Sequence, residues 1–482
     1  MKELHKNQLL KLAEESLNIV VDKIQDLPQS GSYREYYRFF HQQGTVLGVF
    51  NDDVEENEAF FSFTHSFLKH QILVPGILKI SADRKFYFLE DIGDTTLYEF
   101  LKSHNKAGVF SAETLYYYQQ SLIQLAKLQV VASMAMDYSV CYPSKSFDTQ
   151  SMMWDLNYFK YHFLKTARIP FHEQRLEDDF IKLVNYLSEA GTEYFLYRDF
   201  QSRNIMIHNS EVYFIDYQGG RKGALQYDVA SLLFDAKAVM PDHVRKQLLD
   251  FYFAQLQGLC KVNKDSFYEY FTGFALIRVL QAMAAYGFRG LIEKKRHFIE
   301  SIPFGIRNIQ YLLQNYNLPF EMPELQKTLQ KLCESDHVQD VIRQYTVLNI
   351  RINSFSFRRG VPYNDSGDGS GFVFDCRLLH NPGRYDEYKQ FCGKDSNVQA
   401  FFAREQEVEV FLENIFAIAD QAILKYKQRK HNHITFNFGC TGGQHRSVFC
   451  AERLAKHIKE RFDCNIMLRH LELEKVNLKS NS

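Results

Sequence analysis

Two short segments near the middle of the chain constrain its fold more than any other feature. Tyr197–Asn204 reads Tyr-Arg-Asp-Phe-Gln-Ser-Arg-Asn, and Val212–Asp216 reads Val-Tyr-Phe-Ile-Asp. Asp199 can orient a hydroxyl group and accept its proton, while Asn204 and Asp216 offer the hard oxygen atoms that Mg²⁺ prefers beside phosphates. The order of these residues predicts a phosphoryl-transfer enzyme, in which adjoining loops bring a base and two metal ligands together.

The bulk composition bounds the class of protein. A chain of 482 residues is too long for one ordinary core, so two or three domains are expected. The net charge of −1 excludes a global basic field that would recruit nucleic acid. Eight cysteines without paired metal spacing favour free thiols in a reducing cytoplasm. The sequence has no run of about 18 uninterrupted apolar residues, so we expect no membrane span.

The first two thirds of the chain change from a mixed pattern to a helical one. Up to about residue 95, the pattern predicts helices at His5–Val21 and Val54–His70 and strands at Thr45–Phe50 and Lys85–Glu90. From there to about residue 335 the spacing is mainly helical, interrupted by the catalytic run and its two strands. We therefore expect a small lobe at about 20–95, a helical lobe at about 96–335, and a nucleotide between them.

The last 135 residues alternate between strand and helix patterns. Strands are predicted at Leu348–Phe357, Phe372–Asp375 and His433–Gly439, and helices at Phe402–Lys427 and Ser447–Arg461. This alternation indicates a separate small α/β domain at 345–478.

The first region resembles the aminoglycoside phosphotransferase and choline-kinase-like superfamily. Besides the catalytic run, the resemblance rests on four segments: Gly31–Arg38, Leu89–Leu97, Ile215–Gly219 and Gln226–Leu232. Within this superfamily the chain is most similar to kinases that phosphorylate N-acetylmuramate and N-acetylglucosamine at the anomeric hydroxyl. The resemblance implies a bilobal protein-kinase-like fold that uses ATP and Mg²⁺.

The resemblance also implies roles for individual residues. Asp199 and Arg203 would be catalytic, and Asn204 and Asp216 would bind the metal. The ATP-binding residues would be Gly31, Ser32, Tyr33, Arg34, Arg38, Glu90 and Asp91. Asp228 would hold the catalytic region in place, or it would simply cap a helix.

Two positions depart from the family pattern. Tyr197 stands where the family usually has His, and its hydroxyl could replace the imidazole as a hydrogen-bonding group. The strand at Thr45–Asn51 contains no Lys or Arg, although many kinases place their phosphate-binding Lys there. Arg34 and Arg38 are the nearest alternative cations. A degenerate kinase domain in a regulatory protein is therefore a second hypothesis.

A second anion-binding loop lies near the C-terminus. Gly439–Val448 reads Gly-Cys-Thr-Gly-Gly-Gln-His-Arg-Ser-Val between a predicted strand and a helix. Small residues let backbone N–H groups converge there, the helix N-terminus adds positive potential, and Arg446 could clamp a phosphate. The spacing from Cys440 to Ser447 also fits a cysteine phosphatase, a minor alternative in which the Cys440 thiolate attacks phosphorus.

Residues 347–475 resemble the C-terminal domain of the RapZ family, whose members sense glucosamine-6-phosphate and act as RNA adaptors. The similar segments include Ser354–Phe357, Phe374–Pro382, the glycine loop and Arg469–His470. The resemblance implies a phosphosugar pocket formed by Asp375, Arg377, Thr441, Gly442, Gly443, His445, Arg446 and Ser447. Gln444 replaces a common Lys, and the small excess of basic residues does not support RNA binding by charge alone. We also expect that this domain could mediate a homo-oligomer.

Together these patterns predict an ATP-dependent kinase of an amino sugar in cell-wall sugar salvage. Its partners would be a small sugar substrate and a phosphosugar ligand on the C-terminal domain. The alternatives are a regulatory RNA or protein adaptor and, least favoured, a Cys440 phosphatase.

Overall fold

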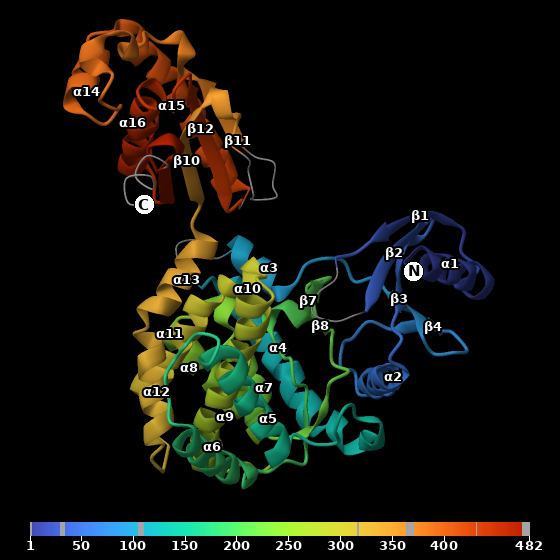
Figure 1. The fold of residues 1–482 in the computed structure, drawn as a ribbon. Coiled ribbons are helices and arrows are strands. Elements are labelled where there is room, and N and C mark those ends of the chain that lie inside the picture. Colours follow the sequence, from blue (N-terminus) through green and yellow to red (C-terminus); the bar gives the residue numbers. More distant parts are fainter. Residues whose placement is uncertain are drawn as a thin grey trace. The chain divides into compact units, whose positions relative to one another are not determined.

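The computed structural model describes residues 2–28, 34–104, 110–315, 318–362, 371–429 and 431–474. The chain divides into two compact units, Met1–Ser335 and Asp336–Ser482 (Figure 1). The predicted loop residues Gly31, Ser32 and Tyr33 lie outside the described residues.

The first unit begins with a five-stranded antiparallel sheet in the order β1-β2-β3-β5-β4 (Figure 1). Side chains alternate across it because successive strand residues point to opposite faces. Phe86 and Phe88 pack with Leu9 of helix α1, while Tyr87 stacks on Phe60 of helix α2. The bounds are α1 Lys2–Leu17, β1 Val21–Asp26, β2 Glu35–His41, β3 Gly44–Phe50, α2 Val54–Lys69, β4 Ile77–Ile80 and β5 Phe86–Glu90.

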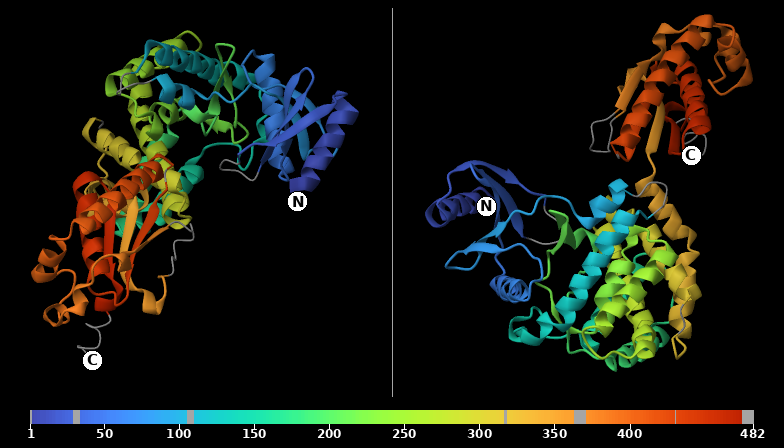
Figure 2. Two further views of the ribbon diagram at one scale, coloured as in Figure 1. Left: turned by 90° about the horizontal axis from the view of Figure 1, so that it is seen from above. Right: turned by 180° about the vertical axis from the view of Figure 1, so that it is seen from behind.

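Helices make up most of the described remainder of the first unit, with two short two-stranded antiparallel sheets among them. The strands are β6 Tyr194–Leu196, β7 Ile205–His208, β8 Glu211–Phe214 and β9 Arg221–Gly223, paired β6–β9 and β7–β8. The helices are α3 Leu97–His104, α4 Ala112–Val130, α5 Thr149–Phe159, α6 Glu173–Ser188, α7 Leu225–Leu233, α8 Asp242–Gln257, α9 Lys264–Ala285, α10 Arg296–Ile299, α11 Ile302–Asn315 and α12 Pro323–Cys333. In Figures 1 and 2 the β7–β8 hairpin lies between the small sheet and the helices.

One helical segment, Lys264–Ile292, is long and apolar enough to cross a membrane, although the sequence pattern predicted none. Its most apolar window is 72% buried among the other helices of the first unit, so the fold accounts for its composition. It includes α9 and the π-helical turn Tyr286–Ile292.

The second unit contains a four-stranded parallel sheet in the order β11-β12-β10-β13. Its core joins the apolar faces of α15 and α16 to β10 and β12. The bounds are α13 Asp336–Thr346, β10 Asn349–Ser356, β11 Gly371–Asp375, α14 Ser396–Phe402, α15 Gln406–Gln428, β12 His433–Cys440, α16 Arg446–Arg461 and β13 Asn465–His470.

The first helix is shorter than its sequence pattern predicted. It ends at Leu17, because Asn18 adopts a positive φ of 54° that the helix cannot continue through. Val21 then begins strand β1 instead of ending the helix.

Candidate active site and anion loop

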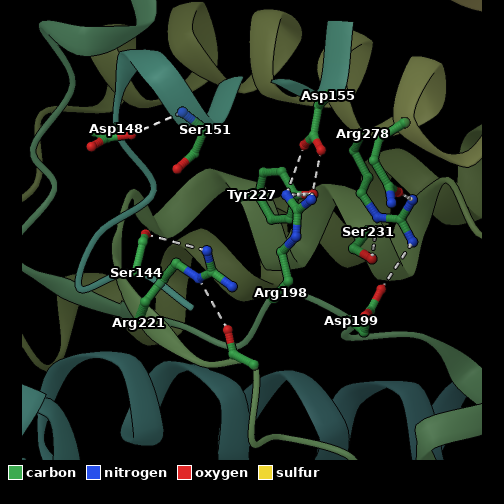
Figure 3. Close-up of polar contacts among 12 residues, drawn as sticks. Ser144, Asp148, Ser151, Asp155, Arg198, Asp199, Arg221, Tyr227, Ser231 and Arg278 are labelled. Carbon is green, nitrogen blue, oxygen red and sulfur yellow. Dashed lines mark hydrogen bonds and ion pairs between the residues drawn. The ribbon is translucent and has the colours of Figure 1, made fainter. Parts of the chain in front are cut away.

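The catalytic loop leaves strand β6 in a conformation that side-chain contacts hold in place. Arg198 has a φ of 85°, which is costly for a residue with a Cβ atom. Its guanidinium group makes two hydrogen bonds of 2.7 Å to the Asp155 carboxylate on α5 and another of 2.7 Å to the Tyr227 hydroxyl (Figure 3). These contacts orient the next residue, Asp199, whose side chain stays about half exposed.

Asp228 on helix α7 holds the backbone of the same turn in place. Its carboxylate accepts hydrogen bonds from the backbone N–H groups of Tyr197 at 2.6 Å and Arg198 at 3.0 Å. Complete burial raises the pKa of Asp228 to about 7, and the two backbone hydrogen bonds act in the opposite direction. The bracing role is confirmed, whereas the helix-cap alternative is wrong because α7 begins after Ala224.

Tyr197 stands at the position where the resembling kinase family usually has His. Its side chain is fully buried, and its hydroxyl donates a hydrogen bond to the backbone oxygen of Ile215. The hydroxyl therefore acts as a hydrogen-bonding group at this position. Because Ile215 precedes Asp216, the bond ties the catalytic loop to the second predicted metal ligand.

Asn204 and Asp216 lie side by side, as the sequence order predicts. The Asn204 amide donates to the Asp199 backbone oxygen at 2.9 Å and lies 3.4 Å from Asp216 Oδ2. Asp216 has a φ of 68°, another strained position. Among the described residues no three His, Cys, Asp or Glu side chains cluster as a metal site. One carboxylate and one amide suit Mg²⁺, which usually takes its remaining ligands from phosphates and water.

A pocket opens beside Asp199 between the catalytic loop and helices α9 and α10. Arg278 of α9 donates at 2.8 Å to Ser231 Oγ and at 2.7 Å to Gln281 Oε1, and its Nη2 lies 4.0 Å from Asp199 Oδ1 (Figure 3). Burial, followed by the charges of neighbouring cations, lowers the pKa of His297 at this pocket. The other polar lining residues include Tyr98, Gln201, Arg203, Asp235, Lys237 and Ser301.

Four of the predicted ATP-binding residues, Arg34, Arg38, Glu90 and Asp91, lie in the part of the chain that the structure describes. Arg34 directly precedes β2, and its side chain is almost fully buried beside Glu56 of α2. Arg38 lies farther along β2 and pairs with Asp91 at the end of β5, which keeps the pKa of that carboxyl below its usual value despite burial. Glu90 is exposed and accepts a hydrogen bond from Gly76 N at 2.9 Å.

In the second unit, the glycine loop follows β12 and folds around the Cys440 thiol. Gly443 N donates to Cys440 Sγ at 3.1 Å, and Ser447 Oγ lies 3.2 Å from the same sulfur. The Thr441 backbone oxygen accepts from Ser356 Oγ at 2.7 Å, while the Thr441 and Gly442 residues are exposed. The loop therefore presents an open rim above a buried thiol.

The charged residues predicted around this loop form hydrogen bonds and ion pairs with other residues of the second unit. Arg446 Nη1 donates at 3.0 Å to the backbone oxygens of Arg377 and Leu379, and His445 Nε2 lies 3.0 Å from Tyr388 O. Arg377 forms an exposed two-point ion pair with Asp375 and stacks over the Phe357 ring at 4.2 Å. Arg446 thus links the loop to the Asp375–Arg377 segment.

Comparisons with known proteins identify the second unit by sequence. Residues 348–474 match the RapZ C-terminal domain. A nucleotide-binding protein of Thermotoga petrophila is 38% identical over 136 residues, which is 28% of this chain and 46% of that protein. One from Xylella fastidiosa is 35% identical over 127 residues, 26% of this chain and 42% of that protein. The RapZ-like part therefore spans less than half the length of these curated relatives.

Solved structures resemble the first unit at low sequence identity. They include a choline kinase from Cryptosporidium parvum (10% identity, TM-score 0.45) and the amicoumacin kinase hAmiN in complex with AMP-PNP, Ca²⁺ and Ami (11%, TM-score 0.43). Each match covers 67% of this chain and 99% of the other. By its own elements, the first unit has a sheet lobe followed by a helical lobe, and the second is a separate small α/β RapZ-like unit, as the sequence predicted.

Several pocket residues were not predicted from the sequence. Arg278, Lys237 and His297 lie on separate elements and reach the Asp199 pocket only through the packing of the helical lobe. No local motif surrounds them, although Asp235 could have been suspected from its position soon after the Asp228 segment. Asp155, which fixes Arg198, is likewise distant in sequence.

Proposed function

We propose that the first unit is an ATP-dependent kinase of an amino sugar of the N-acetylmuramate or N-acetylglucosamine type, with the anomeric hydroxyl as acceptor. One observation carries this proposal: Asp199 lines a polar pocket, and its backbone oxygen accepts a hydrogen bond from the Asn204 amide, which itself lies 3.4 Å from Asp216 Oδ2. An acceptor hydroxyl in the pocket would therefore lie between a base and the site of the transferred phosphate.

The residues of the site divide the chemistry among them. Asp199 would orient the acceptor hydroxyl and accept its proton, and Arg278, whose Nη2 lies 4.0 Å from Asp199 Oδ1, would hold that carboxylate toward the pocket. Arg203, which also lines the pocket, would stabilise charge on the transferred phosphoryl group. Asn204 and Asp216 would hold Mg²⁺, which neutralises phosphate charge when bound.

The pocket's charge favours an acidic member of the amino-sugar class. Three permanent cations, Arg203, Lys237 and Arg278, line it together with His297. Of the two carboxylates there, Asp235 accepts hydrogen bonds from Ser202 Oγ at 2.5 Å and from Lys237 N at 3.2 Å, so it is engaged with the loop itself. A carboxylate on the acceptor would compensate this excess of positive charge, and N-acetylmuramate carries one whereas N-acetylglucosamine does not.

For the RapZ-like unit, we propose that the exposed rim of the glycine loop binds a phosphorylated amino sugar, which would connect both units to cell-wall sugar salvage in the cytoplasm. The backbone N–H groups at the start of α16 support anion binding there. A Cys440 phosphatase is disfavoured, because Arg446 donates to two backbone oxygens and Cys440 is buried.

A sugar panel tests the kinase proposal. ADP release should be fastest with N-acetylmuramate, slower with N-acetylglucosamine and negligible with choline. Asp199→Ala should lower kcat by about 10²–10⁴-fold, whereas Asp178→Asn, on the exposed face of α6, should not change it. Wild-type protein that leaves every amino sugar of the panel unphosphorylated would contradict the proposal.

A further inference from the structure

Strand β3 lacks the cation that a kinase site needs for the phosphates of its nucleotide. Its sequence, Gly-Thr-Val-Leu-Gly-Val-Phe, has no Lys or Arg. Protein kinases supply this charge from the equivalent strand, and its ion pair with a Glu of the neighbouring helix keeps it in place. A phosphotransferase without that residue must draw the charge from another element.

Arg34 offers a cation from the residue that precedes a different strand. It lies directly before β2, which pairs with β3 in the sheet, and only 2% of the residue is exposed. Its Nη2 lies 3.3 Å from Glu56 Oε2 on α2, and its guanidinium group lies 5.6 Å from the Phe60 ring. Burial opposes its charge, but Tyr87, Tyr36, Glu56 and Asp216 together hold its pKa above the ordinary value. The Phe60 ring in turn stacks at 5.0 Å on Tyr217, the residue that follows the predicted metal ligand Asp216, so the cation lies on the side of the sheet that faces this segment.

The partner carboxylate is itself fixed in position. Asn51, directly after β3, donates its amide to Glu56 Oε2 at 2.8 Å and to Asn57 Oδ1 at 3.0 Å. Asp53 caps α2 by accepting from Glu56 N at 3.0 Å. The end of β3 thus positions the carboxylate that holds the cation, although β3 does not supply the cation.

Arg38, the other candidate, is committed elsewhere. Its guanidinium group donates to Asp91 at 2.6 and 3.0 Å and to Asp94 at 2.8 and 2.9 Å. Four hydrogen bonds to two carboxylates tie β2 to the segment that links the two lobes of the first unit. Phosphates would have to break this network to reach Arg38.

We propose that Arg34 binds the phosphates of the nucleotide, with Glu56 as the residue that positions it, so that the phosphate-binding cation of this kinase lies directly before β2 instead of on β3. The inference rests on the proposed nucleotide use of the first unit but not on the identity of the sugar. It assigns Arg38 to the architecture of the hinge between the lobes.

Calorimetric titration of the full chain with adenosine and with ADP, both without metal, isolates the phosphate contribution. Wild-type protein should bind ADP more tightly than adenosine, and Arg34→Gln should reduce that affinity ratio by about tenfold or more. Arg34→Lys should retain most of the ratio. Arg38→Gln should leave the ratio unchanged, because any effect at the hinge applies to both ligands alike.

Arg84→Gln is the matched structural control. Arg84 pairs with Glu58, which lies on α2 as Glu56 does, but this ion pair is exposed. If Arg34→Gln does not fold, Glu56→Gln is tested instead. This variant removes the carboxylate that positions Arg34, so it should also lower the ratio of ADP affinity to adenosine affinity. An unchanged ratio in a folded Arg34 or Glu56 variant overturns this inference alone. A wild-type protein that binds neither ligand overturns the kinase proposal as well.

Discussion

At the scale of single residues, the backbone of the candidate site is strained at positions next to, or among, the proposed catalytic and metal-binding residues. Arg198, which directly precedes the proposed base, and Asp216, one of the two proposed metal ligands, both have positive φ values. Each conformation costs of the order of 1–3 kcal/mol and persists because the surroundings determine it. For Arg198 the surroundings are Asp155 and Asp228, and for Asp216 they include Gln218, whose amide donates to Oδ1 at 2.9 Å.

The bond from Tyr197 to Ile215 tests this account. Tyr197→Phe removes the donor and leaves a buried backbone oxygen without it, so the free energy of unfolding should fall by about 1–3 kcal/mol. The kcat of sugar phosphorylation should also fall, because Asp216 loses its link to the catalytic loop. Urea denaturation and steady-state kinetics measure both effects. Tyr116→Phe, on an exposed residue, is the control; equal behaviour of the two variants would contradict the role given to Tyr197.

The site could be predicted from the sequence only as far as its residues are local. Asp199, Asn204 and Asp216 lie within 20 positions, and their spacing carries the chemistry. Arg278 and Lys237 could not be identified, because helix packing alone brings them to the pocket. The choice between Arg34 and Arg38 likewise depended on which carboxylate each arginine meets.

At the scale of elements, helix α7 holds the catalytic loop in place through the buried carboxyl group of Asp228. Asp228 receives both backbone N–H groups of the strained turn, so the helix and the loop form one unit. Because burial raises the pKa of Asp228 to about 7 in the folded chain, the folded state binds a proton that the unfolded chain, with a value near 3.8, releases.

This raised pKa makes a contribution to stability that depends on pH. The contribution is complete below about pH 4, declines as the pH rises towards 7, and is constant above that value. Asp228→Asn removes the titration, so the difference in unfolding free energy between wild type and variant should shift against the wild type over this interval, by up to about 4 kcal/mol. Chemical denaturation at pH 4.5, 6 and 7.5 measures it. A difference that stays constant across these values would show that Asp228 is ionised throughout.

The glycine loop of the RapZ-like unit offers a second test among the elements. Gly443 has a φ of 71°, and a Cβ atom there would lie 2.9 Å from Ser356 N, whereas a Cβ on Gly442 meets nothing within 4 Å. Gly443→Ala should therefore destabilise the protein by about 1–3 kcal/mol, and Gly442→Ala by less than about 0.5 kcal/mol. Thermal unfolding of the two variants compares them directly, and similar losses would contradict the assigned loop geometry.

Elements with a strong period could be predicted, and short or half-exposed ones could not. β12 and α16 lie within one residue of their predicted bounds, since β12 is buried along almost its whole length and α16 places its buried apolar residues at helical spacing. β4 and β13 were missed because their residues are mostly half-exposed or exposed and give no clear alternation. Such strands form through pairing with a buried neighbour, which a local pattern does not contain.

At the scale of the whole molecule, the chain joins two compact units, and we propose a separate anion site in each. In the first, the proposed base Asp199 and metal ligands Asn204 and Asp216 adjoin a pocket lined by cations, and the second has a glycine loop at a helix N-terminus. Because the two constellations share no residue, Asp199→Asn should abolish phosphoryl transfer while full-length protein still binds glucosamine-6-phosphate with wild-type affinity.

The measurement that tests the central claim most directly is phosphorus NMR of the full-length protein incubated with ATP, Mg²⁺ and N-acetylmuramate. The account predicts a new resonance, coupled to the anomeric proton of the sugar, that grows as ADP forms and that is absent with Asp199→Asn. ADP formed with inorganic phosphate as its only partner, or a sugar phosphate that forms equally fast in the variant, would contradict it.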